Sequence, residues 1–457
     1  MGTNLLAGAA DADITPAIGT PMGGYGRREG VAEGTHAPLR CHAVVFDDGT
    51  TPVGLVVCDL LFVSRDLSAL VRTLVGDALG WRPEQVMVAA THTHSGPSGL
   101  SLEQDAAYVT MVARQAAGAL RAAFAGRAPA RLKYAEAGVS SISQNRRDPG
   151  GPIETVARML VADPITGGAD RDVVATVVNY ACHATVLEYD NLRYSPDFPG
   201  TVVDVLRSLV GGRAVYLQGC AGNINPVWMR HDQADARRVG TILGAAAARS
   251  VSEARPIGHG QWAVNLSWYE DTPKDVAGSR EVPAGRIRAE SATVALPRRA
   301  RSSPSDLKRD LADAAAAVDA AAADPDRRRA LSPRKAALEA EFFFASYPGF
   351  YGDDDEPAGG GPADAVDEAE VQVLWLGDQT AIVGLPGEPF IEIAHEIRRR
   401  SGIANLIVAG YCNEAAGYIP TLAEFGRQGY EVGCAPYQPE AAGLLVDAAL
   451  SALASAA

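Results

Sequence analysis

The sequence predicts an α/β fold in which helices flank a mixed sheet. Short runs rich in apolar and β-branched residues alternate along the 457-residue chain with longer runs of helical periodicity. Many of the short runs are apolar without alternation, which is typical of strands covered on both faces. Hydrophobic residues make up 47% of the chain and charged residues 21%, a balance that favours a soluble globular protein over a disordered or fibrous one.

The predicted strands are the β-branched runs at 43–46, 53–60, 85–90, 173–180, 214–218, 371–376, 381–385 and 406–409. Helical periodicity predicts helices at 67–79, 104–124, 200–209, 235–251, 391–400 and 440–454. Several of the strands end in Gly-rich, polar segments, so turns at strand ends are where we look for chemistry.

Two stretches are additions to this scheme. The segment at about 303–345 is rich in Ala and charged residues and is interrupted by Asp324-Pro325-Asp326, so it predicts a helical hairpin. The acidic and Gly-rich segment at about 352–366 predicts a mobile, solvated loop. Because strand-like sequence resumes at Val371, we interpret residues 1–457 as a single domain with an insertion.

Charge and cysteine usage restrict the partners of the chain. Its 55 acidic and 41 basic residues give a formal charge of −14, which argues against nucleic acid or anionic lipid as a partner because both require clustered positive charge. No uncharged apolar run reaches the roughly 18 residues of a transmembrane helix, and the N-terminus has no cationic leader. Six scattered cysteines without a Cys-x-x-Cys pair predict reduced, buried thiols. We expect a cytoplasmic protein that acts on a small molecule, without membrane insertion; a homo-oligomer is left open.

Two of the eight histidines, His92 and His94, follow the apolar strand that ends at Ala90. In an extended backbone, residues two apart point to the same side, so both imidazoles could face one site above the sheet edge. Imidazole binds divalent metals well. The alternative for a His-x-His segment is two half-buried histidines at a turn.

Other predicted strands end in similar polar tips. His183 follows the strand at 173–180, and Glu388 lies between Gly and Pro after the strand at 381–385. Each has a structural alternative: His183 as a satisfied core histidine, and Glu388 as a carboxylate that favours the start of the next helix. Taken together, the histidines and the carboxylate are what an open catalytic zinc site requires.

The motif Thr91-His92-Thr93-His94-Ser95-Gly96-Pro97 resembles a signature of the neutral (non-lysosomal) ceramidase family. Further segments resemble the catalytic domain of that family in the same order along the chain, at 10–16, 22–25, 36–40, 144–146, 179–183, 222–226, 387–389, 417–421 and 430–431. The resemblance implies a zinc amidase that cleaves a fatty-acyl amide. It does not extend to the leader and the β-rich C-terminal domain of the secreted ceramidases.

The resemblance also implies roles for individual residues. It makes His92, His183, Glu388 and Tyr418 the ligands of one Zn²⁺ per chain, although another divalent metal is compatible with the same set. It places His94, Arg146 and Tyr430 around the scissile carbonyl. Of these, His94 is our first choice for delivering a proton to the leaving amine, because the pKa of histidine lies closest to neutral pH.

One departure from the family changes the expected mechanism. Members carry a Ser in a Gly-Asp-x-Ser-Pro motif, whereas this chain has Gly222-Asn223-Ile224-Asn225-Pro226. Asn225 cannot act as a nucleophile, so metal-activated water becomes the expected attacking group, with Asn225 and Asn223 as hydrogen-bonding groups.

The sequence therefore predicts a zinc-dependent hydrolase that cleaves the amide bond of a soluble small molecule. The alternatives are a metal-dependent esterase or lactonase, a ceramidase proper, a non-catalytic metal-binding relative that has lost turnover, and a structural or lipid-interacting protein. The acyl and amine groups of the substrate are not determined by the sequence.

Overall fold

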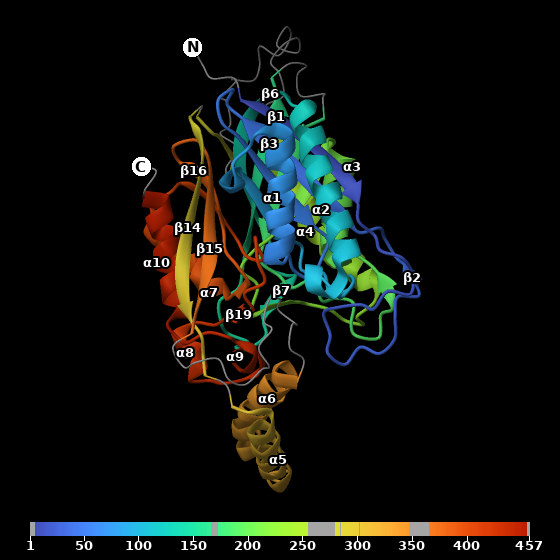
Figure 1. The fold of residues 1–457 in the computed structure, drawn as a ribbon, viewed down its shortest axis with the longest axis vertical. Helices are drawn as coiled ribbons and strands as arrows, with labels where there is room; N and C mark the ends of the chain where they lie inside the picture. The colour runs from blue at the N-terminus through green and yellow to red at the C-terminus, as the bar shows by residue number, and fades with distance from the viewer. Residues whose placement is uncertain are drawn as a thin grey trace, which may run out of the picture.

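The computed structural model describes residues 5–165, 172–254, 279–283, 285–300, 302–346 and 365–454. The loop predicted at about 352–366 lies outside the described residues as far as residue 364. Within the described part, the predicted combination of a mixed sheet with flanking helices is confirmed (Figure 1).

The larger sheet contains nine strands in the order β11-β9-β8-β6-β1-β3-β4-β5, with β13 paired to β6. Strands β4 and β5 are parallel, as are β9 and β11, and the remaining pairs are antiparallel. The strands are β1 (Leu6–Asp13), β3 (Arg40–Asp47), β4 (Pro52–Cys58), β5 (Val86–Ala90), β6 (Ala128–Gly138), β8 (Val156–Pro164), β9 (Ala175–Tyr180), β11 (Arg213–Gln218) and β13 (Ser279–Glu281).

A second sheet of four strands packs against one face of the first. Its order is β14 (Ile287–Pro297), β15 (Val366–Leu376), β16 (Thr380–Gly384) and β18 (Asn405–Ala409). Leu55 and Met87 of the larger sheet share one apolar cluster with Ile382 and Ile407 of the smaller sheet. The apolar strands are thus covered on both faces, as predicted. One of these faces is covered by the second sheet instead of by helices.

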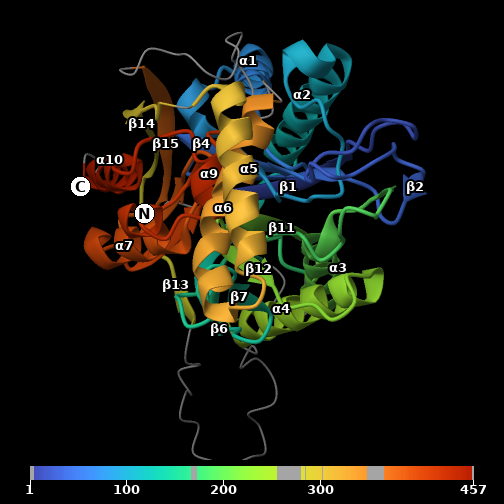
Figure 2. The ribbon, with the colours of Figure 1, turned by 90° about the horizontal axis from the view of Figure 1, so that it is seen from below.

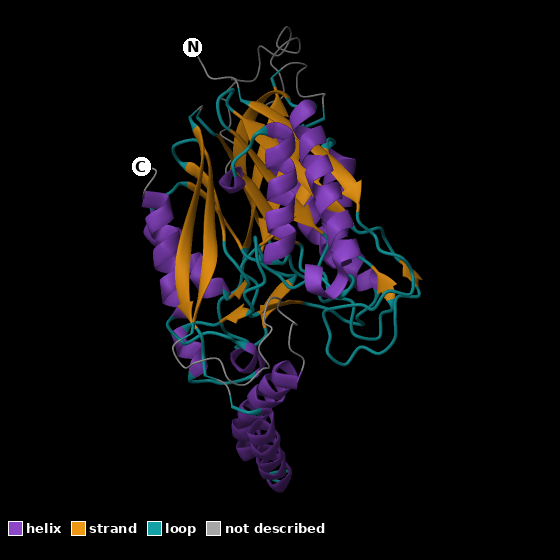
Figure 3. Ribbon diagram, in the orientation of Figure 1, coloured by secondary structure: helices purple, strands orange, loops and turns teal. Residues whose placement is uncertain are grey.

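Helices form the two outer layers (Figure 3). Those on the larger sheet are α1 (Arg65–Leu79), α2 (Leu102–Ala125), α3 (Asp197–Val210) and α4 (Gln233–Glu253). Those on the smaller sheet are α7 (Ile391–Ser401) and α10 (Ala441–Ala454). The helix α1 begins after Ser64, whose side chain accepts a hydrogen bond from the Leu67 N–H, and it ends at Gly80 in the left-handed conformation.

The segment at about 303–345 contains α5 (Pro304–Ala320) and α6 (Pro325–Ser346), which pack against each other. They project from the body of the molecule, with α6 against the short helix α9 (Tyr430–Cys434) (Figures 1 and 2). Ser303 caps α5 by accepting from the Asp306 N–H. The other short elements are β2 (Gly34–Thr35), η1 (Pro83–Gln85), β7 (Ser143–Asn145), β10 (Arg193–Tyr194), β12 (Ile224–Pro226), β17 (Glu388–Pro389), β19 (Tyr418–Ile419) and α8 (Leu422–Phe425).

The six cysteines are all buried, so the prediction of buried thiols is confirmed. In the part of the chain that the structure describes, no helix has the length and apolar character needed to cross a bilayer.

A buried histidine ties β1, β3 and the end of β4 together. The Nδ1 of His42 lies 2.9 Å from Asp11 Oδ1, and its Nε2 lies 3.6 Å from Asp59 Oδ2. Burial alone would lower the pKa of His42, but the two carboxylates outweigh it and raise the pKa to about 9. His42 is therefore a charged imidazolium at neutral pH inside the protein.

This imidazolium predicts a pH dependence of stability. Because the folded pKa of about 9 exceeds the unfolded value of 6.5, the stabilisation is fully present below pH 6.5 and is lost as the pH rises through 9. The loss should be on the order of 3 kcal/mol. Urea denaturation between pH 6 and about 10 should show that the free energy of unfolding declines more steeply with pH for the wild type than for His42→Gln. If the free energy of unfolding declined equally with pH in both proteins, the assignment of a charged His42 would be contradicted.

Candidate metal centre

His92 lies in the turn after β5 and has a φ of +62°, a left-handed conformation that non-glycine residues rarely adopt. The extended backbone predicted for this segment is therefore wrong at His92. Its Nδ1 donates to the carbonyl of Leu61 at 2.7 Å, which leaves Nε2 with a free lone pair in the neutral tautomer. Backbone strain of this kind costs about 1–3 kcal/mol and is concentrated at functional sites.

His183 follows β9 and is completely buried. Its Nδ1 lies 2.7 Å from the carbonyl of Ala221 and 3.2 Å from that of Ile224, so its Nε2 is also left as an acceptor. Burial, and then the charge of Arg146, lowers the pKa of His183 to about 4, so its imidazole is neutral at pH 7. A neutral imidazole held through Nδ1 is the state in which histidine binds a metal.

Glu388 is brought to the histidines by a short ladder that the sequence does not reveal. Strand β17 pairs in parallel with β19, so Glu388 lies beside Tyr418. Gly387 precedes it with a φ of +63°, and a Cβ there would lie 2.4 Å from the carbonyl oxygen of Gly417. Only glycine allows the turns that carry Glu388 and Tyr418 to approach this closely.

The carboxylate and the two imidazoles converge on one point. The Oε2 atom of Glu388 lies 3.3 Å from Nε2 of His92 and 3.3 Å from Nε2 of His183. Both Glu388 Oε2 and His183 Nε2 are buried without a hydrogen-bond partner in the described part of the chain. Buried lone pairs of this kind are costly unless they are satisfied, and a divalent cation satisfies all three together. The residues therefore fit a zinc ion.

His94 lies in the same cluster. Its Nε2 is 3.1 Å from Nε2 of His92, and among the described residues His92, His94 and His183 form the group of side chains able to hold a metal. Unlike the other two, His94 has a buried Nδ1 that has no hydrogen-bond partner among the described residues. Burial, and then the two neighbouring histidines, holds the pKa of His94 well below its usual range. The separate role of His94 stays a prediction.

The loop before β2 covers His94. The ring of Tyr25 lies 4.9 Å from the His94 ring, and its hydroxyl donates to the carbonyl of Leu187 at 2.9 Å. Gly24 has a φ of +98°, and a Cβ there would lie 2.8 Å from His94 Cα. The backbone of this loop thus touches His94 directly and excludes water from one side of it.

Arg146 connects the other predicted site residues. Its guanidinium donates to Glu431 at 2.6 Å, to Asn225 Oδ1 at 3.2 Å, to the Gly222 carbonyl at 2.8 Å and to the Tyr418 hydroxyl at 3.1 Å. Four partners hold this cation in place, so Arg146 orients Tyr418 and Asn225.

Tyr418 and Tyr430 differ in their placement. The Tyr418 ring is buried and stacks on His183 at 6.5 Å between centroids. Tyr430 is 47% exposed and meets Tyr418 edge-on at 6.0 Å, so it lies at the rim of the site.

Asn223 does not face the metal ligands. Its amide nitrogen donates to Glu392 at 3.0 Å, and its oxygen accepts from the Ile391 N–H at 3.0 Å, at the start of α7. The expectation that Asn223 acts as a hydrogen-bonding group of the site is wrong, because its side chain caps a helix instead.

Sequence reasoning missed two residues of this site. Tyr411, with a φ of +58°, has its ring 4.2 Å from that of His92. Gln218 hydrogen-bonds the segments that carry both His92 and His183. Both residues could have been found from the sequence, because Gln218 ends an apolar strand and Tyr411 follows one. The same rule identified His92, His183 and Glu388.

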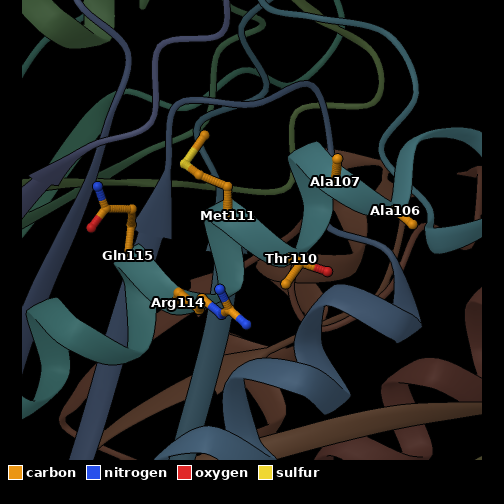
Figure 4. Close-up of a pocket in the computed structure, with 6 residues that line it drawn as sticks. All are labelled: Ala106, Ala107, Thr110, Met111, Arg114 and Gln115. Atoms are coloured by element: carbon orange, nitrogen blue, oxygen red, sulfur yellow. The ribbon is translucent and has the colours of Figure 1, made fainter.

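A separate depression lies on the outer surface of α2 (Figure 4). It is lined by Ala106, Ala107, Thr110, Met111, Arg114 and Gln115, and it contains none of the predicted site residues. The predicted site residues thus lie at the convergent strand ends and not at this depression.

Comparisons with known proteins agree with the resemblance found in the motifs. Residues 5–146 match the family model described as neutral/alkaline non-lysosomal ceramidase, N-terminal. A neutral ceramidase from Mycobacterium tuberculosis is 33% identical over 102 residues, which cover 21% of this chain and 16% of that protein. The match thus spans a small part of the curated relative.

Two solved structures have the same fold over nearly the whole chain. A ceramidase complexed with C2 matches with a TM-score of 0.73 and 18% identity, covering 99% of this chain and 75% of that one. The neutral ceramidase from Pseudomonas aeruginosa matches with a TM-score of 0.72 and 19% identity, covering 100% and 75%. The resemblance inferred from the motifs is confirmed: this chain has the neutral ceramidase fold, and its residues 5–146 carry the sequence pattern of the N-terminal part of the neutral ceramidase family.

Proposed function

We propose that the protein is a zinc-dependent hydrolase that cleaves the amide bond of a soluble N-acyl compound. The observation that carries the proposal is the convergence of Glu388 Oε2 on the Nε2 atoms of His92 and His183, each at 3.3 Å. Two imidazoles and a carboxylate are the protein ligands of many catalytic zinc sites, which keep a further position open. The similarity to ceramidases supports an amide as the bond that is cleaved.

The side chains around the ligands can supply what amide hydrolysis needs. When bound, the metal would polarise the scissile carbonyl and activate water. The Nε2 atom of His94 lies at the cluster, where it can donate to the carbonyl oxygen or pass a proton to the leaving amine. Arg146 donates to the hydroxyl of Tyr418, whose ring stacks on that of His183. Asn225 accepts a hydrogen bond from Arg146 through its side-chain oxygen, which leaves its amide N–H groups available as donors to a substrate.

The proposal is tested by metal content and turnover of the purified chain. We expect one zinc per chain, and hydrolysis of members of a panel of soluble N-acyl compounds that ceases after chelation and returns with Zn²⁺. The matched panel contains esters, lactones and ceramide in mixed micelles. Bound metal with turnover of esters or lactones but no amide would replace the proposal by an esterase or lactonase, and bound metal with no turnover would indicate a binding protein.

Ceramidase activity proper is the second candidate, because relatives with that name match the sequence and the fold. It would require the chain to accept a long-chain amide drawn from a lipid phase. Faster cleavage of ceramide than of every soluble amide would establish it over our proposal.

A further inference from the structure

The two histidine-bearing turns follow strands that do not pair with each other. His92 follows β5 and His183 follows β9, and the sheet order places β5 at one end and β9 next to the other end. The ladder hydrogen bonds of the sheet therefore do not directly fix the distance between the two imidazoles. Beyond the strand ends, the two turns are joined on the C-terminal side of the histidines by the parallel bridge between Thr93 and Ala184, where the His94 N–H donates to the Ala184 carbonyl at 3.2 Å.

The side chain of Gln218 provides a second connection, on the N-terminal side of the two histidines. It is the last residue of β11 and is fully buried. Its Nε2 donates to the carbonyl of Thr91 at 3.2 Å and to the carbonyl of Cys182 at 2.7 Å. Thr91 directly precedes His92, and Cys182 directly precedes His183. One amide group thus joins the backbones of both turns.

The orientation of this amide is determined by its other contacts. Its Oε1 accepts from the backbone N–H groups of Cys182 and Gly219 and from the Tyr216 hydroxyl, each at 3.2 Å. If the amide were flipped, its NH₂ group would face these three donors and its oxygen would face the two carbonyls, so the hydrogen bonds would be lost. All of its hydrogen-bonding capacity is used inside the protein, which makes the connection rigid.

The backbone of Gln218 extends the connection to the third ligand. Its carbonyl accepts from the Gly410 N–H at 3.2 Å, at the end of β18. The next residue, Tyr411, donates its N–H to the carbonyl of Gly387 at 2.9 Å, and its carbonyl accepts from the Ala90 N–H at 3.1 Å. Gly387 directly precedes Glu388. Gln218 therefore lies at the junction of all three ligand-bearing turns.

We propose that Gln218 is a positioning residue that presets the metal site by fixing the His92 and His183 turns relative to each other. The inference rests on the proposed metal site and is independent of which bond the protein cleaves. An amide is required because the position needs two N–H donors toward carbonyls and an acceptor toward three donors. Neither a carboxylate nor an apolar side chain meets both needs.

The test compares Gln218→Met with Gln372→Met, which removes an equally buried amide elsewhere. Gln372 donates to the carbonyls of Glu84 and Val86, and neither residue adjoins a ligand. Zn²⁺ affinity of the metal-free proteins is measured by competition with a chromophoric chelator, and thermal unfolding is recorded for each. We expect both variants to lose stability, but only Gln218→Met to lose zinc affinity, by about 10–100-fold.

Gln218→Asn serves as a second variant if Gln218→Met does not fold. It keeps the amide but is one methylene too short to reach both carbonyls, so we expect a smaller loss of zinc affinity in a folded protein. Wild-type zinc affinity in a Gln218 variant, or an equal loss in Gln372→Met, would overturn the inference. A wild-type chain that binds zinc but cleaves no amide contradicts only the proposed function, whereas a wild-type chain that binds no zinc overturns both.

Discussion

Replacing His92 with alanine should remove the metal from the protein, whereas replacing His94 should leave the metal bound and remove activity. His92 has its Nδ1 held by the Leu61 carbonyl and its Nε2 directed at Glu388, which is the arrangement of a ligand. His94 lacks a partner at Nδ1 among the described residues. Loss of a general acid or base lowers turnover by about 10²–10⁴-fold. Metal analysis and kcat for both variants test this prediction.

His36→Ala is the matched control, because His36 is an exposed histidine. It should retain both metal and activity. All three variants should keep the wild-type circular dichroism spectrum; His92→Ala keeps the left-handed backbone strain at this position, because only glycine relieves it. Loss of metal in His94→Ala would show that His94 is itself a ligand, as its place in the histidine cluster allows.

The second large effect is expected from Arg146→Met. The variant leaves Glu431, which is 4% exposed, without its 2.6 Å partner and frees the Tyr418 hydroxyl. Removing one member of a buried ion pair costs about 3–5 kcal/mol. Because Arg147 still pairs with Glu431 at 2.5 Å, we expect a loss near 3 kcal/mol, the lower end of that range. Urea denaturation measures it.

Arg427→Met is the control for this prediction. Arg427 is largely exposed and pairs with Asp148 at 3.2 Å and with Glu424 at 3.0 Å. Because Glu424 keeps its pair with Arg147 at 2.6 Å, the loss of Arg427 should cost no more than about 1 kcal/mol. Combining Arg146→Met with Glu431→Gln should recover part of the stability, because the uncompensated charge is then gone. Equal stability of the two arginine variants would mean that the buried network contributes little.

The strands that the sequence identified are those buried on both faces, such as β4, β5 and β9. The longer strands that it missed are β1, β6, β8 and β14, and it also missed the strands of two or three residues. Strand β1 reads Leu-Ala-Gly-Ala-Ala-Asp-Ala-Asp, and Ala, Gly and Asp are poor strand formers. Its structure comes from antiparallel pairing with β3 over its whole length, which is a tertiary constraint.

The residues of the candidate site also divide into those found from the local sequence pattern and those found by other means. His92, His94, His183 and Glu388 were found from sequence because each follows an apolar strand, and the C-terminal ends of such strands collect ligand-binding groups. The motif resemblance added Tyr418, Tyr430, Arg146 and Asn225, which no local pattern singles out.

The sequence by itself determined the α/β class, the strand ends that carry the chemistry and the residue types that suit a metal. Only the tertiary structure decided that a second sheet covers the first, that β17 pairs with β19 to place Glu388 beside Tyr418, and that Gln218 joins two turns. It also turned Asn223 away from the metal ligands. The physical reason is that side-chain type and periodicity are local, whereas these contacts join residues far apart in the chain and depend on how the two sheets pack.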